Sequence, residues 1–206
     1  MRRLGRELGV EAMSLYSYVE NKQDLIEGVV EQVFRQMPLV APGPGDWPDR
    51  LRAHATTFRE VLLQHPNAVV LVAGRPLVTD GTMAFVESAL VELQAYGLDL
   101  ETADMVLGTI AAFVIGSVCE ETGEATRAAA GYAPHAEEGA ATRFPNVVAV
   151  TSGTQDRDVE FAFGLSVVIG GIQALIAAGG IAPDPSRAGA GAPTSAAAPL
   201  QDPERP

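Results

Sequence analysis

The stretch Leu4–Phe34, LGRELGVEAMSLYSYVENKQDLIEGVVEQVF, decides how the N-terminal part of the chain folds. At its start, Leu4 and Leu8 lie one helical turn apart, so they share one face of a short helix over residues 2–8. Gly9 then interrupts the pattern, because glycine adopts the positive φ of a tight turn without steric cost. The stretch therefore opens with a short helix that ends in a turn.

A second helix is predicted over residues 11–19. Its apolar stripe is formed by Ala12, Leu15 and Val19, and the residues left facing outward are Met13, Ser14, Tyr16, Ser17 and Tyr18. Such a face is typical of a solvated helix or of a protein interface. Hydroxyl groups and aromatic rings also suit contacts to phosphates and thymine methyl groups, and a short helix fits the major groove of DNA. The residues alone leave both interpretations open.

A third helix is predicted to begin after Asn21, with Asp24 three positions on, as in a capping box. Lys22, the only lysine of the sequence, falls in its first turn. There the ammonium group and the free backbone N–H groups could hold a phosphate together. An ordinary surface lysine is the alternative.

The rest of the chain predicts helices and no sheet, so the fold class is all-α. The segment 38–47 is rich in proline and glycine and reads as a linker, which leaves residues 1–37 as a small helix-turn-helix unit. Residues 48–179 form the larger domain, and the Ala/Pro/Gly/Ser-rich residues 180–206 are expected to be disordered. Within the larger domain we expect helices up to Gln64, over 81–96, from Asp99 through 118 and over 159–178, a helical turn at 68–73 and a short helix near 144–150.

The amino-acid composition limits the classes of function that the chain can have. A net charge of −12 argues against non-specific coating of nucleic acid, so any DNA contact must come from a few local cations. The single cysteine and three histidines show no nucleophile–base pair or metal-ligand spacing, so we expect no enzyme, no cofactor and no metal site. The apolar run 105–118 is shorter than the roughly 20 residues of a membrane span, and no signal peptide precedes the chain, so a cytoplasmic protein without a membrane partner is expected.

Two nearly all-apolar helices, at 105–118 and 159–178, are more than a small monomer covers easily. Helices without a polar face are buried in a core or between subunits. We therefore expect them to pair with their copies in a four-helix bundle of a homodimer.

The segment LGRELGVEAMSLYSYVENKQDLIEGVVEQV resembles the DNA-binding region of the tetracycline-repressor (TetR) family of one-component regulators. The larger domain resembles the family's ligand domain in Trp47–His65, Gly74-Arg75-Pro76, Phe113–Glu120 and Phe161–Leu165, so the likeness covers roughly residues 1–179. It implies a homodimeric repressor that a small-molecule inducer releases from a palindromic, double-stranded DNA operator. By the same likeness, Ser14 and Tyr16 contact phosphates or base edges, Lys22 clamps a phosphate and Arg2 reads a base. Ala12, Met13, Ser17 and Tyr18 occupy positions that vary with operator sequence.

The resemblance also implies a ligand site, in altered form. Phe58 and Arg75-Pro76 match drug-contacting positions of the family, whereas His54 and Ala89 replace a drug-contacting asparagine and glutamine. Leu71 replaces the histidine that ligates magnesium, so we expect weak or no tetracycline binding. The expected apolar pocket, suited to a hydrophobic or aromatic molecule with or without an acid group for Arg75, is lined by His54, Phe58, Leu71, Arg75, Phe85 and Leu107.

One departure concerns the start of the chain. Members of the family carry a complete helix before the position of Arg2, and this sequence begins inside the second helix. We therefore expect a loose N-terminal unit that is truncated at its start. A second function stays open on this ground, namely a dimeric small-molecule-binding protein that has lost DNA binding with its first helix.

Overall fold

The computed structural model describes residues 1–41, 43–73, 79–131, 139–151 and 156–179, and every regular element among them is helical. The N-terminal helices are α1 (Arg2–Leu8), α2 (Ala12–Leu15) and α3 (Lys22–Phe34). The body follows with α4 (Trp47–Gln64), the 3₁₀ turn η1 (Pro66–Ala68), α5 (Val69–Ala73), α6 (Asp80–Ala95), α7 (Leu100–Ala129), α8 (Ala140–Arg143), α9 (Pro145–Thr151) and α10 (Arg157–Ala177). The predicted all-α class is confirmed.

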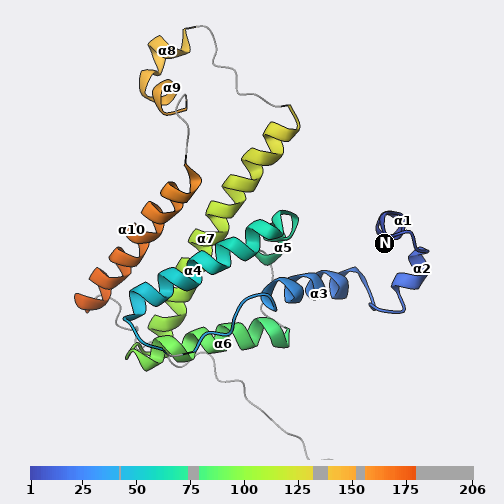
Figure 1. Ribbon diagram of the computed structural model, residues 1–206, viewed down its shortest axis with the longest axis horizontal. Helices are drawn as coiled ribbons and strands as arrows, with labels where there is room; N and C mark the ends of the chain where they lie inside the picture. The colour runs from blue at the N-terminus through green and yellow to red at the C-terminus, as the bar shows by residue number, and fades with distance from the viewer. Residues whose placement is uncertain (42, 74–78, 132–138, 152–155, 180–206) are drawn as a thin grey trace, which may run out of the picture.

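Helices α1 and α2 form a small unit at one end of the molecule (Figure 1). Gly9 ends α1 with a φ of 68°, as the turn was predicted to require. Gly5 is buried, and a Cβ there would lie 2.8 Å from the backbone oxygen of Val10. Glycine at this position therefore lets the chain return close beside α1, which fixes the angle between the two short helices.

Helix α3 connects this unit to the body (Figure 1). The Asn21 side chain accepts hydrogen bonds from the backbone N–H groups of Gln23 and Asp24, so the predicted N-cap is confirmed. The carboxylate of Asp24 accepts from the backbone N–H of Glu20, one residue before the position of a standard capping box. Farther along, Val30, Val33 and Phe34 are buried in the body, so α3 is exposed at its start and anchored at its end.

In the body, α7 is the central helix, against which α4, α5, α6 and α10 pack. Local signals set the helix starts: Asp46 caps α4, a Thr79–Thr82 capping box starts α6, and Asp99 accepts from Thr102 at the start of α7. One continuous core joins these helices to the end of α3. Its most completely buried side chains include Leu62, Val69, Val106, Val114, Val118, Leu165 and Ile169.

Several boundaries differ from those predicted. Helix α2 spans four residues, and the chain from Tyr16 to Val19 continues in tight turns closed largely by i→i+3 hydrogen bonds. Helix α7 extends to Ala129, beyond the apolar run that predicted it, because alanine and glutamate sustain a helix without an apolar stripe. The four-residue α8 was not predicted, whereas the helical turn at 68–73 and the short helix near 144–150 are confirmed.

On α6, 47% of Met83 is exposed, so this side chain does not lie in the core. The buried and half-buried positions of α6 are instead Thr82, Phe85, Ala89, Glu92 and Leu93. The inward face of α6 therefore includes the carboxylate of Glu92, which cannot be recognised from the spacing of apolar residues alone. Val86 and Leu90 are half-buried beside it.

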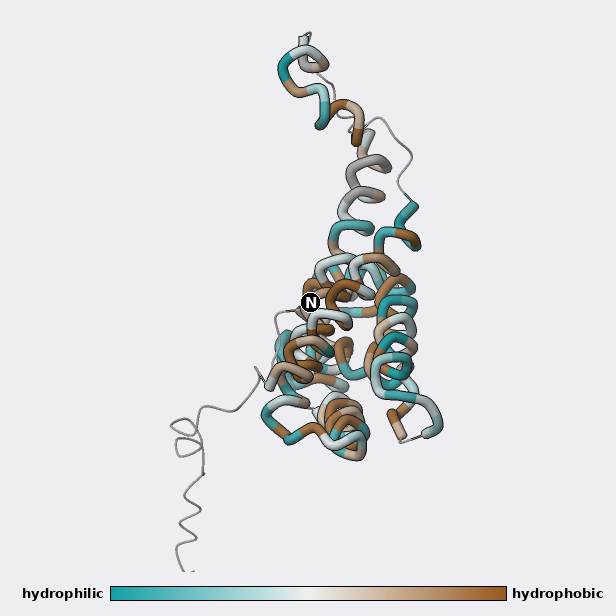
Figure 2. The backbone as a smooth tube through the Cα atoms, turned by 90° about the vertical axis from the view of Figure 1, so that its left-hand side faces the viewer, coloured by the Kyte–Doolittle hydropathy of each residue, from teal (hydrophilic) through white to brown (hydrophobic). Residues whose placement is uncertain are grey.

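Helices α7 and α10 are long and strongly apolar. Over Leu100–Gly123 and Arg157–Ala177 they have the length and composition of membrane-spanning helices, although core helices of soluble proteins meet the same test. The sequence argument that the apolar run is too short is therefore wrong on length, because the helix continues on both sides of it. In Figure 2 both helices run side by side and carry α8 and α9 away from the rest of the body.

Candidate functional site

The outward face of α2 and the turn after it present the side chains expected to meet DNA. Met13, Ser14, Tyr16, Ser17 and Tyr18 are all exposed, Tyr18 by 87%. Ala12 differs from the other predicted contact residues, because it is half-buried on the side that faces α1. The structure therefore brings five of the six predicted residues of this helix onto one accessible tip.

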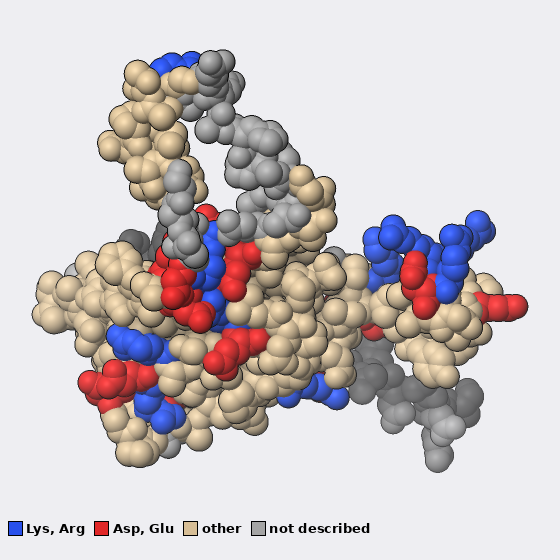
Figure 3. Space-filling view, turned by 45° about the horizontal axis from the view of Figure 1, so that its top comes forward, with Lys and Arg blue, Asp and Glu red and all other residues tan. Residues whose placement is uncertain are grey.

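The cations of the small unit lie on α1 and at the start of α3. Arg2, Arg3 and Arg6 are exposed on α1, and Lys22 is exposed at the first residue of α3. Lys and Arg side chains gather on one side of this unit, beside acidic ones (Figure 3). At Lys22 the positive end of the α3 dipole adds to the ammonium charge, which favours an anion there.

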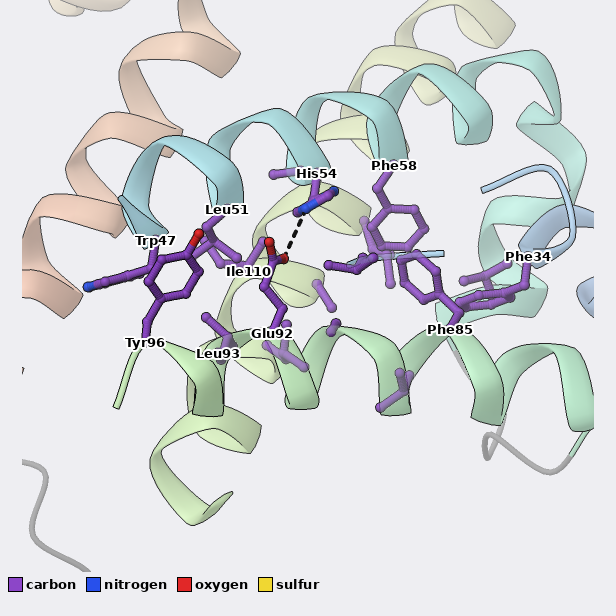
Figure 4. Close-up of a pocket in the computed structure, with 18 residues that line it drawn as sticks. Phe34, Trp47, Leu51, His54, Phe58, Phe85, Glu92, Leu93, Tyr96 and Ile110 are labelled. Carbon is purple, nitrogen blue, oxygen red and sulfur yellow. Dashed lines mark ion pairs between the residues drawn. The ribbon is translucent and has the colours of Figure 1, made fainter. Parts of the chain in front are cut away.

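A cavity of about 220 Å³ lies in the body, walled by α3, α4, α6 and α7 (Figure 4). Of the residues predicted to bind a ligand, His54, Phe58, Phe85 and Leu107 line it. Leu71 is not among the lining residues, and its neighbour Val72 takes that place, because the short α5 turns the two side chains in different directions. Arg75 lies outside the described residues.

One side of the cavity is aromatic. The ring of Phe34, at the end of α3, lies 6.2 Å from the ring of Phe58 and 5.7 Å from that of Phe85, centroid to centroid. These spacings are those of favourable tilted and edge-to-face pairs. Helix α3 therefore ends in a cluster of rings that any molecule in this part of the cavity would touch (Figure 4).

A small polar group interrupts the apolar wall between this cluster and the Trp47–Tyr96 side (Figure 4). Glu92 is 4% exposed, and its Oε1 accepts from Nε of Arg50, which compensates its charge. Its Oε2 lies 3.1 Å from Nε2 of His54. This distance is that of an ion pair when the imidazole is protonated (Figure 4), and the buried Nε2 has no hydrogen-bond partner among the described residues.

A second, polar cleft lies between α4, α7 and α10 around Arg59, which is 7% exposed. Its guanidinium donates to Asp158 at 2.7 Å and to Glu121 at 2.9 Å, and it lies 4.8 Å from the centre of the Phe161 ring. Burial alone would lower the pKa of Arg59, but the hydrogen bonds to Asp158 and Glu121 raise it above its ordinary value. Arg59 and its two carboxylate partners therefore connect α4, α7 and α10.

The residues that line the cavity include Trp47, Glu92 and Tyr96, which were not predicted from the sequence, and Arg50, which pairs with Glu92, was not predicted either. A signal was present for one of them: Phe85, Ala89 and Glu92 follow at i, i+4 and i+7, so a carboxylate stands on the inward face of an otherwise apolar stripe. Among the residues that the structure describes, no group of three or more His, Cys, Asp or Glu side chains could hold a metal ion. The expected absence of a metal stays a prediction.

Residues 38–176 match the protein family described as "Tetracyclin repressor-like, C-terminal domain". The chain belongs to the TetR family. Its members found by comparison are named as transcriptional regulators and repressors, not as enzymes. The predicted membership of the TetR family is thereby confirmed.

The alignments with individual relatives cover different fractions of those proteins. A transcriptional regulator of Saccharopolyspora erythraea is 32% identical over 122 residues, 59% of this chain and 52% of that protein. The tetracycline repressor class G of Vibrio anguillarum is 28% identical over 180 residues, 86% of this chain and 85% of that protein. The chain thus spans about half the length of the first relative and most of the second.

Solved TetR-family structures share the fold. ActR of Streptomyces coelicolor, crystallised in complex with actinorhodin, superposes with a TM-score of 0.66 at 26% identity, covering 84% of this chain and 86% of that one. A possible TetR-family regulator from the same organism reaches a TM-score of 0.70 at 28% identity, covering 84% and 88% of the two chains. The arrangement of α1 to α10 is therefore that of this family.

Proposed function

We propose that this TetR-family protein is a homodimeric transcriptional repressor that binds a palindromic DNA operator and leaves it when a small apolar or aromatic inducer fills the cavity. In this proposal Ser14, Tyr16 and Lys22 contact phosphates or base edges. Met13, Ser17, Tyr18, Ala12 and Arg2 contribute to the choice of operator. The ligand contacts include His54, Phe58, Phe85 and Leu107.

The observation that carries the proposal is the path of α3. Its first residue, Lys22, is exposed beside the tip formed by α2, and its last residue, Phe34, lines the cavity. A helix of this length spans about 20 Å as one stiff rod. A molecule that displaces the Phe34 ring therefore moves the far end of the same helix, which carries α1 and α2.

Release from DNA then needs no contact between inducer and operator. Two tips fit a palindrome when their separation matches about one helical turn of B-DNA, roughly 34 Å. A ligand that binds more tightly to the conformation with a different separation shifts the equilibrium by the ratio of its two affinities. Couplings of this kind commonly amount to 5–150-fold in affinity.

The homodimer is supported by the surface of α7 and α10. On α10 the exposed positions Phe163, Val167, Gly170 and Ala174 follow at helical spacing, and a Cβ at Gly170 would meet nothing within 4 Å. Large exposed side chains on this face include Phe163 at 73% and Val167 at 58%. A second copy covering these helices in a four-helix arrangement would remove this apolar surface from water.

The inducer class follows from the lining of the cavity. Nearly all of it is apolar, with three phenylalanine rings on one side, which favours an aromatic ligand. ActR, similar in fold and 26% identical, was crystallised in complex with actinorhodin, which supports a ligand-binding role for the larger domain. Weak or no binding of magnesium–tetracycline stays a prediction, because a leucine stands where the family's magnesium ligand is expected, and a calorimetric affinity in the micromolar range or better would contradict it.

The DNA half of the proposal is tested by selection from a random-sequence duplex pool, using the full 206-residue chain at 0.15 M salt. We expect a palindrome with half-sites about one turn apart to be enriched. Tyr16→Ala should then lower the affinity for this site by about tenfold. The control Thr126→Ala removes an exposed hydroxyl group from α7 and should leave the affinity unchanged.

If no sequence is enriched, the DNA half of the proposal is wrong. A chain that still dimerises and binds small molecules would then match the alternative, a dimeric small-molecule-binding protein.

A further inference from the structure

The cavity holds one buried polar atom without a hydrogen-bond partner among the described residues, and it lies beside a carboxylate oxygen. Nε2 of His54 is buried and has no hydrogen-bond partner among the described residues, and Oε2 of Glu92 lies 3.1 Å from it. The hydrogen bond that Glu92 accepts, from Arg50, ends on the other carboxylate oxygen. A buried polar atom left unpaired is unfavourable, so this site suits a ligand that supplies the missing hydrogen-bond partner.

The charges of Arg50, Glu92 and His54 determine which class of ligand suits the cavity. Arg50 already pairs with Glu92, so with a neutral His54 imidazole the group has no spare positive charge for an acid. A ligand carboxylate would bring its own negative charge against the carboxylate of Glu92 inside an apolar wall, which is unfavourable. A ligand ammonium would bury an additional charge in the same wall, where desolvation opposes it.

A neutral hydroxyl group fits without such a cost. It can donate its hydrogen to Oε2 of Glu92 and accept a hydrogen from Nε2 of His54, because a hydroxyl is both donor and acceptor. The two protein atoms are near enough together for one oxygen to reach both. The rings of Phe34, Phe58 and Phe85 lie to one side of this group and receive the apolar part of the same ligand (Figure 4).

We infer that His54 and Glu92 make the cavity selective for neutral, hydroxyl-bearing aromatic compounds, such as phenols, over aromatic acids and amines of the same size. This inference rests on the proposed function and names the ligand class for it. Arg50 acts as a positioning residue, since it holds the Glu92 carboxylate without being needed as a contact of the ligand.

The test is a calorimetric titration of the full chain with four probes that share one ring system: 1-naphthol, naphthalene, 1-naphthoate and 1-naphthylmethylamine. We expect 1-naphthol to bind at least tenfold more tightly than each of the others. In His54→Phe, which keeps a ring but removes both nitrogens, the preference for 1-naphthol over naphthalene should fall below threefold. The control His65→Phe removes an imidazole that pairs with Gln36 outside the cavity and should keep the full preference.

Glu92→Gln provides a second variant, because it retains size and hydrogen bonding but removes the negative charge. It should weaken the rejection of 1-naphthoate while its thermal unfolding reports whether the fold is intact. Equal binding of all four probes, or tightest binding of 1-naphthoate, would overturn the selectivity and leave the proposed function standing. Binding of none of the probes would overturn the ligand half of the proposed function, and the selectivity with it.

Discussion

Arg59 joins three helices through one guanidinium group, from α4 to Glu121 on α7 and to Asp158 on α10. Arg59→Met keeps most of the apolar length of the side chain and removes the charge. It should lower the free energy of unfolding by about 1–3 kcal/mol, nearer the lower figure because Asp158 is mostly exposed. Urea unfolding measures the change. Arg52→Met, whose pair with Asp49 is exposed, is the control and should cost less than about 0.5 kcal/mol. Equal losses in both variants would contradict the role of Arg59.

Asp99 makes the stability of the fold depend on pH. Hydrogen bonds from the backbone and side chain of Thr102 lower the pKa of this carboxyl group below its ordinary value of 3.8. A lowered folded-state pKa stabilises the fold above pH 3.8, and that contribution disappears as the pH falls through the folded-state value. Asp99→Ala should therefore unfold at lower urea than the wild type at pH 7. The gap should narrow below pH 3.8, and a gap that widened on acidification would contradict this assignment.

At the level of elements, the connecting helix α3 contains Gly28, which is exposed and whose Cβ would meet nothing within 4 Å. Gly28→Ala should stabilise the protein by about 0.5–1 kcal/mol, because alanine loses less backbone entropy in a helix. The matched control is Gly81→Ala on α6, where the new Cβ would lie 3.1 Å from Cγ of Glu31. Thermal unfolding should show a gain for the first variant and no comparable gain for the second.

Element existence could be predicted from the sequence because caps and apolar spacing are local. Asn21, Asp46 and Asp99 mark three helix starts where the structure has them. The length of α7 and the brevity of α2 could not be predicted, since tertiary packing and turn hydrogen bonds decide them. The cavity was predicted in its aromatic part through Phe58 and Phe85. Glu92 was not predicted to line the cavity, because apolar spacing identifies only apolar residues. Its ion-pair partner, Arg50, lies on another helix and cannot be recognised from local sequence.

At the scale of the whole molecule, the proposed dimer depends on the exposed stripe of α10. Val167→Lys places a charge in that stripe and should convert the dimer to a monomer at micromolar concentration, because an unpaired charge is costly to bury. Sedimentation velocity gives the oligomeric state directly. Val70→Lys, at an equally exposed apolar position on α5, is the control and should remain dimeric. A dimer that persists in Val167→Lys would show that the subunits meet elsewhere.

In the proposed mechanism, a ligand that fills the cavity weakens DNA binding through α3. The most direct measurement is fluorescence anisotropy of the selected palindrome with the full chain, with and without 1-naphthol at a concentration at which calorimetry shows the cavity filled. We expect the affinity for DNA to fall at least fivefold, within the usual range of such couplings, and bound DNA to weaken 1-naphthol binding by the same factor. An affinity for DNA that stays unchanged while the cavity is occupied would contradict it.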